Sequence, residues 1–390
     1  MTARGAMVPD ESMSGPVSVG AVRSGHDTRD FIELPHRLHR AVLQWVPWFR
    51  ADMRRILSRR HPYFEHSQAE FYLARRGTQV VARAAALENT RYNAHQETRC
   101  AHFYFFDAED DPEAVGRLFD AVRSWARGRG LDTLMGPFGF GGSTGNGILV
   151  EGFEHTAAMN MMSWNPPYYA RLLEGIGFAK HYDAFSAYLD TSTFRLPERV
   201  RSVADHVIAR GRFTVLRFSR KSELKKLAAK IGEVYNVSLA SDADHRDAYP
   251  MSEKELQRAT ADLMSVADPQ LIKVLAYDGE VVGFVFGFPD VSRAIKASDG
   301  RLGPVSILRL LRDLRRTPSL IINGAGILPR FQRLGGNALL YAALEETARS
   351  RAFRDVDLVQ VADTTSLMLS DIQTLGGTVW KVHRVYTRPV

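Results

Sequence analysis

The chain has 390 residues, of which 45% are hydrophobic and 24% are charged. This composition is typical of globular proteins, and the length predicts two or three domains rather than one. The excess of basic residues, 51 Lys and Arg against 44 Asp and Glu, favours an anionic partner such as a phosphorylated cofactor, an acidic substrate or an RNA.

The single cysteine, Cys100, excludes an internal disulfide framework and any site with several thiolate ligands. It lies in a strand-like run, where we expect a buried small residue rather than a nucleophile. No apolar run approaches the ~18 residues of a membrane span, and the N-terminus lacks the pattern of a signal peptide. We therefore expect a cytoplasmic protein without a membrane partner.

The first half of the chain predicts a leader followed by one α/β unit. Residues 1–28 are rich in Gly, Ser, Met and Pro with little apolar periodicity, which predicts a disordered leader. Residues 29–190 then alternate between helical and strand-like periodicity. The expected helices are 35–59 and 112–127, and the expected strands are a hairpin over 71–87 with a turn at Arg76-Gly77, 102–106 and 131–135.

The second half repeats a similar order of elements after a linker. Pro197 and a high density of charge predict the linker over 191–212, partly helical from 198 to 209. Residues 213–390 again read as a mixed α/β unit, with a variable stretch through Arg316, so we expect a duplicated fold. The expected strands are 213–218, 271–277, 281–287, 320–328, 356–361 and 379–386, and the expected helices are 221–239, 253–266, 338–351 and 366–375.

A candidate anion site lies in the second half. The segment 333–338, Arg-Leu-Gly-Gly-Asn-Ala, joins an apolar strand to a helix. The first N–H groups of a helix have no internal partners and carry the positive end of its dipole, and glycines let an anion approach the backbone. This turn therefore predicts either a phosphate cradle or a loop that only caps the helix.

The residues around this turn resemble a known family. Gly326-Ile327-Leu328-Pro329 followed by Arg333-x-x-Gly336-x-Ala338 resembles the acyl-CoA signature of the GNAT superfamily of N-acyltransferases. Further short motifs are similar to those of a bacterial group of two-domain, tandem GNAT proteins, and the likeness covers residues 30–390. These motifs are Gly136-Pro137-Phe138, Glu151-Gly152-Phe153, Asn165-Pro166-Pro167-Tyr168-Tyr169, Gly177-Phe178 and Leu375-Gly376-Gly377 with Val385-Tyr386.

The resemblance implies two tandem GNAT-like domains, each a mixed β-sheet flanked by helices. Residues 29–190 would form a degenerate domain, and 213–390 would bind acetyl-CoA or another acyl-CoA. A splayed strand would offer backbone N–H groups to the acyl carbonyl or the pantetheine arm, and the glycine turn would hold the diphosphate. The implied acyl-CoA residues are Ile327, Leu328, Arg330, Arg333, Leu334, Gly335, Gly336, Asn337 and Ala338.

The first half departs from this pattern at the corresponding turn. Residues 107–111 contain four carboxylates, which would repel a diphosphate. We therefore expect that the first domain binds no CoA and serves as a scaffold or as a wall of the acceptor site.

Residues that move protons are harder to place. Aminolysis of a thioester needs a neutral amine and a protonated or tolerated thiolate. Asp290, which follows the strand 281–287, is the first candidate base, and Asp363 is its rival. GNAT enzymes often place a tyrosine four residues before a Gly-Phe pair, where this chain has Leu173 and Ile372, so the resemblance leaves Tyr386 or water as the acid.

The acceptor site is expected between the halves. An apolar and aromatic wall from the first half, facing Thr364, suits a variable acceptor, although core packing explains the same residues. The glycine-rich stretch 140–147 lacks the Gly-Lys-Ser/Thr ending of a nucleotide loop and is expected to be a mobile loop. The candidate wall residues are Trp164, Asn165, Tyr168 and Tyr169.

The expected activity is N-acyl transfer, with acetyl as the acyl group, from acyl-CoA to a primary amine of a small molecule. Two alternatives stay open: a Fem-type aminoacyltransferase that uses aminoacyl-tRNA, and a non-catalytic CoA-binding or sensing protein. Neither DNA nor a metal is expected, because the chain has no H-E-x-x-H motif, no Cys pair and no calcium loop. The sequence does not distinguish a monomer from a homodimer.

Overall fold

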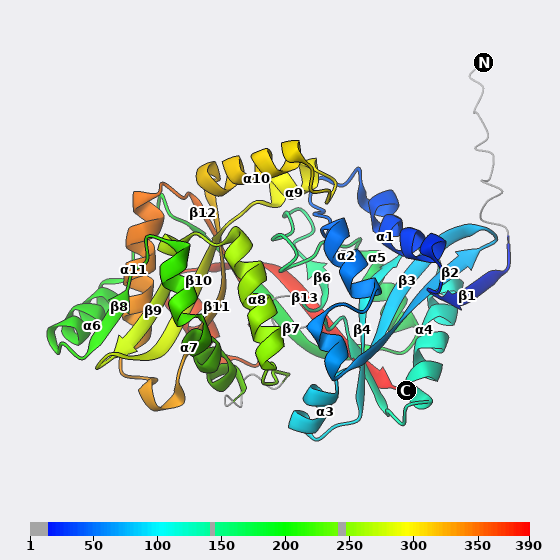
Figure 1. The fold of residues 1–390 in the computed structure, drawn as a ribbon, viewed down its shortest axis with the longest axis horizontal. Coiled ribbons are helices and arrows are strands. Elements are labelled where there is room, and N and C mark those ends of the chain that lie inside the picture. Colours follow the sequence, from blue (N-terminus) through cyan, green and yellow to red (C-terminus); the bar gives the residue numbers. More distant parts are fainter. Residues whose placement is uncertain (1–14, 141–144, 241–246) are drawn as a thin grey trace, which may run out of the picture.

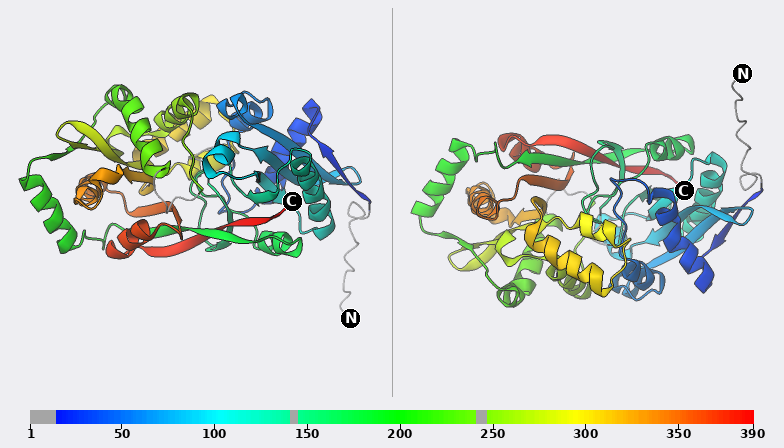
Figure 2. Two further views of the ribbon diagram at one scale, coloured as in Figure 1. Left: turned by 90° about the horizontal axis from the view of Figure 1, so that it is seen from below. Right: turned by 90° about the horizontal axis from the view of Figure 1, so that it is seen from above.

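The structure is a computed structural model, and it describes residues 15–140, 145–240 and 247–390. One continuous mixed sheet of 13 strands runs through the molecule, with helices on both faces (Figures 1 and 2). The strand order is β1-β2-β3-β4-β5-β13-β7-β12-β11-β10-β9-β8, and β6 pairs with β13 outside this path.

The first half supplies the strands on one side of the sheet and the helices that cover them. α4 packs on β1, β2 and β3, whereas α1 packs on β3 and β4 from the other face. The elements are β1 (Val17–Ala21), α1 (Gly25–His39), α2 (Arg50–Leu57), β2 (Gln68–Arg76), β3 (Gln79–Glu88), α3 (Thr90–Gln96), β4 (Cys100–Ala108), α4 (Pro112–Arg127), β5 (Thr133–Gly136), β6 (Ile148–Glu151), α5 (Tyr168–Gly175) and β7 (Ala179–Asp190).

The second half repeats the arrangement after the linker helix. α7 packs on β10 and β11, and α11 lies on the opposite face beside α6 (Figure 1). The elements are α6 (Glu198–Ala209), β8 (Phe213–Leu216), α7 (Lys221–Ala240), α8 (Glu253–Val266), β9 (Ile272–Tyr277), β10 (Glu280–Pro289), α9 (Ser292–Ala297), α10 (Pro304–Arg316), β11 (Ser319–Ile327), α11 (Gly336–Ser350), β12 (Asp355–Ala362), α12 (Ser366–Thr374) and β13 (Thr378–Pro389).

Two long strands cross between the halves. β13, at the C-terminus, lies between β5 and β7 of the first half, and β7 in turn pairs with β12 of the second half. A buried ion pair of 2.6 Å joins Lys381 on β13 to Asp357 on β12, across the strand that separates them. The boundary in sequence at the linker therefore does not coincide with any boundary in the sheet.

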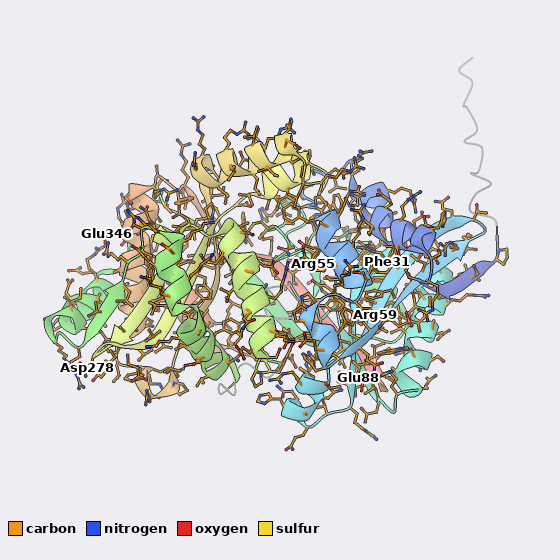
Figure 3. All side chains as sticks on the ribbon, viewed as in Figure 1. Phe31, Arg55, Arg59, Glu88, Asp278 and Glu346 are labelled. Atoms are coloured by element: carbon orange, nitrogen blue, oxygen red, sulfur yellow. The ribbon has the colours of Figure 1, made fainter. Side chains whose placement is uncertain are left out.

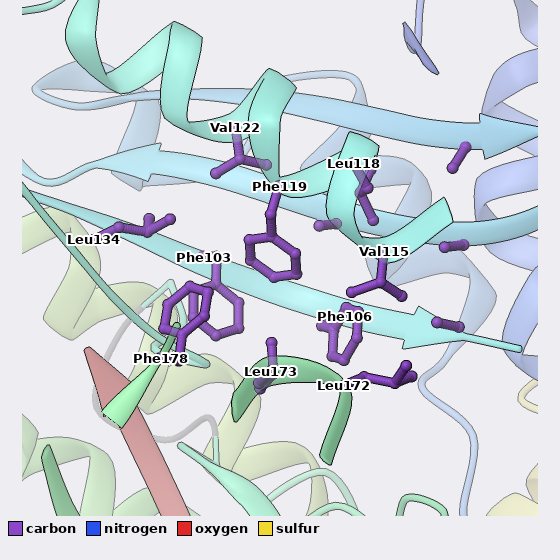
Figure 4. Packing of buried hydrophobic residues seen from close by; sticks show 14 of the residues in the cluster. Phe103, Phe106, Val115, Leu118, Phe119, Val122, Leu134, Leu172, Leu173 and Phe178 are labelled. Atoms are coloured by element: carbon purple, nitrogen blue, oxygen red, sulfur yellow. The ribbon is translucent and has the colours of Figure 1, made fainter. Parts of the chain in front are cut away.

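The core of the first half explains why α4 folds where the sequence predicts. Its apolar residues recur at helical spacing and pack on aromatic residues of β4. Phe103 meets Phe119 edge-on at 5.0 Å between ring centroids, and Asp111 caps the helix by accepting a hydrogen bond from the Ala114 N–H. Figure 4 shows this packing, which Leu172, Leu173 and Phe178 complete from α5 and its following strand.

The structure confirms the mixed α/β class and most expected elements, and it corrects three expectations. Part of the predicted leader is ordered, because Val17 to Ala21 pair with β2 at the sheet edge and Ser24 caps α1. The predicted helix 35–59 is two helices with a break at 40–49. The variable stretch before Arg316 contains α9 and α10. Residues 1–14 of the leader and 141–144 of the glycine-rich stretch lie outside the described residues.

Among the helices of the described residues, none combines the length and the apolar character needed to cross a membrane.

Candidate functional site

The strands β11 and β12 separate halfway along their length. They pair in parallel over only four residues each, Ser319–Ile322 with Asp355–Leu358, although both strands continue beyond this point. The register of β11 against β10 also shifts here, and Gly324 adopts φ +99°, a conformation that favours glycine. The sheet therefore opens into a wedge between 323–327 and 359–362.

The backbone of β11 turns hydrogen-bonding groups toward this wedge. Leu328 donates its N–H to the carbonyl of Val282 on β10 at 2.8 Å. Because alternate residues of an antiparallel strand point to opposite edges, the N–H of Ile327 faces the side that β12 has left. Of the two N–H groups expected from the sequence to meet an acyl carbonyl, Ile327 is therefore the one that faces the wedge.

A cavity of about 300 Å³ lies at the wedge, between the sheet and the helices α7 and α8. Residues of both halves line it, and most of the lining is apolar. Small residues on the two helices leave the space open. The lining includes Phe138, Tyr182 and Ala184 from the first half, and Leu224, Ala228, Ile231, Gly232, Tyr235, Leu256, Ala259, Leu263, Phe286, Asn323, Gly324, Val359, Gln360 and Thr364 from the second.

Few polar groups enter this cavity, and several are fixed by hydrogen bonds. Gln360, in a left-handed conformation at φ +63°, donates its side-chain N–H to the carbonyl of Met161 at 2.9 Å. Burial raises the pKa of Tyr235 to about 12, so its hydroxyl is protonated at neutral pH. The cavity thus presents a small set of polar groups beside an apolar volume, which suits an amphiphilic molecule with one polar end.

A histidine lies next to a carboxylate of the cavity wall, although the histidine itself is not among the lining residues. Asp247, which lines it, accepts a hydrogen bond from the Tyr92 hydroxyl at 2.9 Å and lies 3.2 Å from Nε2 of His181. His181 lies where β7 carries one extra residue relative to β13, since Tyr182 and Lys180 pair with the consecutive residues Val385 and Tyr386. Such bulges often redirect a side chain beside a functional site.

The N-terminus of α11 lies next to the end of β11. Gly335 at its N-cap has φ +87° and carries no capping side chain, and the first turn of the helix contains no acidic residue. A Cβ on Gly335 would lie 2.8 Å from Val207 and 2.9 Å from Val203, both on α6. The linker helix thus forms one wall of the cradle. No N-cap side chain covers the positive end of the α11 dipole, although Asn337 Oδ1 accepts a hydrogen bond from the Ala338 N–H at 3.0 Å.

The other cradle residues predicted from the sequence surround this turn. Arg333 is exposed and makes no ion pair with any described residue, whereas Arg330 pairs with Glu280. Leu334 is exposed and Ala338 is buried. Asn337 donates a side-chain hydrogen bond to Asp371 of α12 at 3.3 Å, so that α11 and α12 are tied together beside the cradle.

The corresponding helix of the first half has no such opening. The carboxylate of Asp111 caps α4 and forms a bidentate pair with Arg76 at 2.9 and 3.0 Å. Asp107 pairs with Arg83 at 2.7 Å, and this guanidinium helps to hold the pKa of the buried carboxyl below its usual value. The chain's own carboxylates occupy the position that a diphosphate would need, as the acidic sequence of 107–111 suggested.

The candidate bases from the sequence lie near the site without lining the cavity. Asp290 accepts a hydrogen bond from the Ser292 N–H at 2.8 Å, and burial raises its pKa. Asp363 pairs with Lys180 at 3.0 Å, while its neighbour Thr364 lines the cavity. Of these three residues, the structure places only Thr364 at the cavity.

The aromatic wall belongs to the first half, and the candidate acid Tyr386, on β13, packs in the core of that half, away from the wedge. Tyr386 is buried in the core around α4 and donates to Glu174 at 2.9 Å. Asn165 donates to and accepts from the backbone of Leu149, and Trp164 donates to the carbonyl of Phe153. Tyr168 and Tyr169 bond the backbone of Ala108. These contacts favour the alternative of core packing.

The pairing of this histidine with the aspartate of the cavity wall could not be found from sequence spacing. His181 and Asp247 are 66 residues apart, and only the tertiary fold brings Asp247 next to β7. The sequence did contain a signal for the cavity, because Leu224, Ala228 and Gly232 follow one another at intervals of one turn on the predicted helix 221–239.

The described residues 15–140, 145–240 and 247–390 contain no group of three His, Cys, Asp or Glu side chains that could share a metal ion.

The chain is similar to two curated proteins over most of its length. It is 29% identical over 391 residues to a protein named bacterial ceramide synthase from Caulobacter vibrioides (strain NA1000 / CB15N), covering 98% of this chain and 100% of that protein. It is 24% identical over 372 residues to Protein YghO of Escherichia coli (strain K12), covering 94% and 93%. No protein-family model matches.

Solved structures identify the fold. A tandem GNAT protein from the clavulanic acid biosynthesis pathway superposes with a TM-score of 0.54 at 12% identity, covering 96% of this chain and 98% of that one. The glucosamine N-acetyltransferase region of a fungal multi-domain β-N-acetylglucosaminidase superposes with a TM-score of 0.56 at 13% identity, covering 96% and 38%. The chain therefore has the tandem GNAT fold that its motifs predicted.

Proposed function

We propose that this protein is an N-acyltransferase that moves a fatty acyl group from acyl-CoA to the primary amine of a long-chain amino alcohol. The observation that carries the proposal is the apolar cavity of about 300 Å³ at the wedge between β11 and β12. The relative from Caulobacter vibrioides is named a ceramide synthase, and a ceramide is a fatty amide of a long-chain amino alcohol. An aliphatic chain matches this lining better than a small polar amine does.

The donor would bind across the wedge and the N-terminus of α11. The helix end, whose N-cap is a glycine, and the exposed Arg333 suit a diphosphate, and the N–H of Ile327 faces the gap where a thioester carbonyl would lie. These groups hold and polarise the donor. Only the second half offers this combination, since Asp111 fills the equivalent helix end of the first half.

The reaction needs a base close to the amine. The amine nitrogen attacks the thioester carbon, a C–N bond forms, the C–S bond breaks, and the thiolate leaves with a proton from the amine or from water. His181 would accept the proton that the ammonium must lose, and Asp247 would orient its ring, since the carboxylate lies 3.2 Å from Nε2. His181 is preferred because its partner Asp247 lines the cavity. Asp290 and Asp363 become second choices, because their partners Ser292 and Lys180 lie outside the lining.

A direct assay tests the proposed reaction. The purified chain, mixed with palmitoyl-CoA and a long-chain amino alcohol, is expected to release free thiol and to form the amide, detected by mass spectrometry. A short polar amine should serve as a poor acceptor because it leaves the cavity unfilled. Coenzyme A binding without turnover would favour the non-catalytic alternative, and binding of tRNA without binding of coenzyme A would favour an aminoacyl-tRNA donor.

Replacing the proposed base should slow the chemical step without weakening donor binding. We expect His181→Gln to lower kcat by about a hundredfold, because glutamine keeps a polar side chain but cannot take the proton. The KM for the acyl donor should stay within about threefold, since the substitution leaves the donor's contacts in place. The acidic limb of the pH–rate profile should also change. His155→Gln is the matched control, since the His155 ring packs on Trp380 with centroids 4.4 Å apart, and neither residue lines the cavity or contacts Asp247. Unchanged kcat in His181→Gln would exclude this base.

Narrowing the cavity should change chain-length preference. Ala228→Leu adds bulk on the lining face of α7 and is expected to lower kcat/KM at least about tenfold for substrates with long chains, with little effect on short ones. Varying the acyl chain and the acceptor chain separately shows which of them enters the cavity. Ala229→Leu, at an exposed position of the same helix, should leave both series unchanged. If Ala228→Leu changes kcat/KM in neither the acyl series nor the acceptor series, the cavity does not hold either chain of the substrates.

Blocking the helix end should weaken donor binding alone. Gly335→Ala places a Cβ less than 3 Å from Val203 and Val207 in a left-handed conformation, so the turn must shift. We expect coenzyme A to bind at least about tenfold more weakly in equilibrium dialysis, as one or two backbone hydrogen bonds to the diphosphate are lost. Gly279→Ala has a similar φ of +84° with no neighbour within 4 Å and should bind normally. If Gly335→Ala and Gly279→Ala bind coenzyme A equally well, the N-terminus of α11 is not part of the donor site.

A further inference from the structure

The helix α10 lies along the outer surface of the second half and has no buried residue. Two leucines, Leu310 and Leu314, face inward and pack on the apolar cluster beneath. The view from above shows the helix resting on the body of the protein rather than inserted in it (Figure 2). Many side chains along the helix extend away from the molecule (Figure 3), whereas the Asp313 side chain is only 13% exposed.

The outward side of this helix is unusually apolar. Five side chains on α10 and the turn before it are each between 46% and 67% exposed. Single exposed apolar residues are common on protein surfaces, whereas a contiguous set on one helix marks an interaction site. The five residues are Leu302, Val305, Ile307, Leu308 and Leu311.

The same helix is strongly basic. Residues 301–316 contain five arginines and a single acidic residue, Asp313. Arg312 pairs with Asp313 at 3.0 Å, but Arg309, Arg315 and Arg316 form no ion pair with any described residue. Three cationic heads with long flexible stems are therefore available for an anionic partner next to the apolar side chains.

A segment of the first half extends this surface. Lys296 of α9 donates a hydrogen bond to the carbonyl of Val42, which brings the loop 40–49 beside the α9–α10 hairpin. Leu43, the next residue, is 77% exposed. The apolar surface thus spans both halves of the molecule.

We propose that α10 and Leu43 dock the protein on an anionic lipid bilayer, with the helix lying in the plane of the headgroups. Leucines that enter the acyl boundary and arginines that contact lipid phosphates are the two features of an interfacial helix. A protein partner would need carboxylates placed opposite each arginine, whereas a bilayer supplies anionic and apolar groups at any position. The absence of a spanning segment from the sequence led us to expect no membrane partner, but a helix that lies on the surface of a bilayer needs no such segment.

The inner side of α10 connects this surface to the cavity. Leu310 and Leu314 pack on the same apolar cluster that includes Leu224, Ile231 and Phe286 of the cavity wall. An amphiphile resident in the bilayer would therefore be held a short distance from the cavity. Membrane docking does not depend on the proposed acyl transfer, because it can be measured without either substrate.

Vesicle sedimentation tests the docking surface with the full chain. We expect the protein to sediment with phosphatidylcholine vesicles that contain about one third phosphatidylglycerol, and only weakly with phosphatidylcholine alone. Leu308→Ser/Leu311→Ser should lower the partition coefficient at least about tenfold. Arg309→Gln/Arg315→Gln/Arg316→Gln should lower it about a hundredfold on the anionic vesicles and remove its dependence on salt.

A matched control removes exposed apolar residues elsewhere. Ile208→Ser/Val379→Ser, at positions 60% and 45% exposed, should bind vesicles as the unmodified protein does. Since all the substituted residues are exposed, circular dichroism should show the same fold for each variant. The proposal is overturned if the unmodified protein ignores anionic vesicles, or if the leucine variant binds them equally well. Light scattering that shows a dimer dependent on Leu308 and Leu311, without vesicle binding, would assign the surface to a second copy.

Discussion

The exchange of β7 and β13 between the halves is the constraint on which the rest of the structure depends. A strand in the interior of a sheet needs a hydrogen-bonding neighbour on both edges, and neither half contains enough strands of its own to supply them. β12 obtains its second neighbour from the first half, and β5 obtains its second neighbour from the C-terminus. The two halves are therefore one sheet, and the buried pair of Lys381 with Asp357 further couples the C-terminal strand to β12.

This constraint also shapes the candidate site. Because β7 holds one edge of β12, that strand keeps its place in the sheet after β11 has left its other edge. The cavity at this wedge then takes its walls from both halves, with Tyr182 on β7 opposite Leu224 and Ala228 on α7. The proposed catalytic pair also combines the two halves, because His181 belongs to the first half and Asp247 to the second. An isolated half would contain neither a closed cavity nor this pair.

Local signals predicted much of the fold. The helices α4 and α8 follow from apolar periodicity with capping residues, Asp111 in one and the capping box of Ser252 and Glu255 in the other. The glycine turn before α11 and the helix itself were also predicted from local sequence patterns. What could not be predicted depends on contacts distant in sequence. The exchanged strands, the proximity of His181 to Asp247, and the pairing of β1 with the sheet edge carry no local pattern. The helix α10 escaped prediction because most of its apolar residues face outward and do not mark a buried stripe.

The position of β13 has a consequence for how the chain is made. This strand lies between β5 and β7 but follows the other strands of the sheet in the sequence, so one edge of β5 and one edge of β7 stay unpaired until residues 378–389 have been synthesised. During that interval their unpaired edges can template association with other nascent chains. Strands that are far apart in the sequence also pair slowly, so we expect the addition of β13 to the sheet to be a slow step of folding. A protein of this topology should therefore rely on chaperones, and a ribosome that stalls before residue 378 would leave a product that no later step can complete.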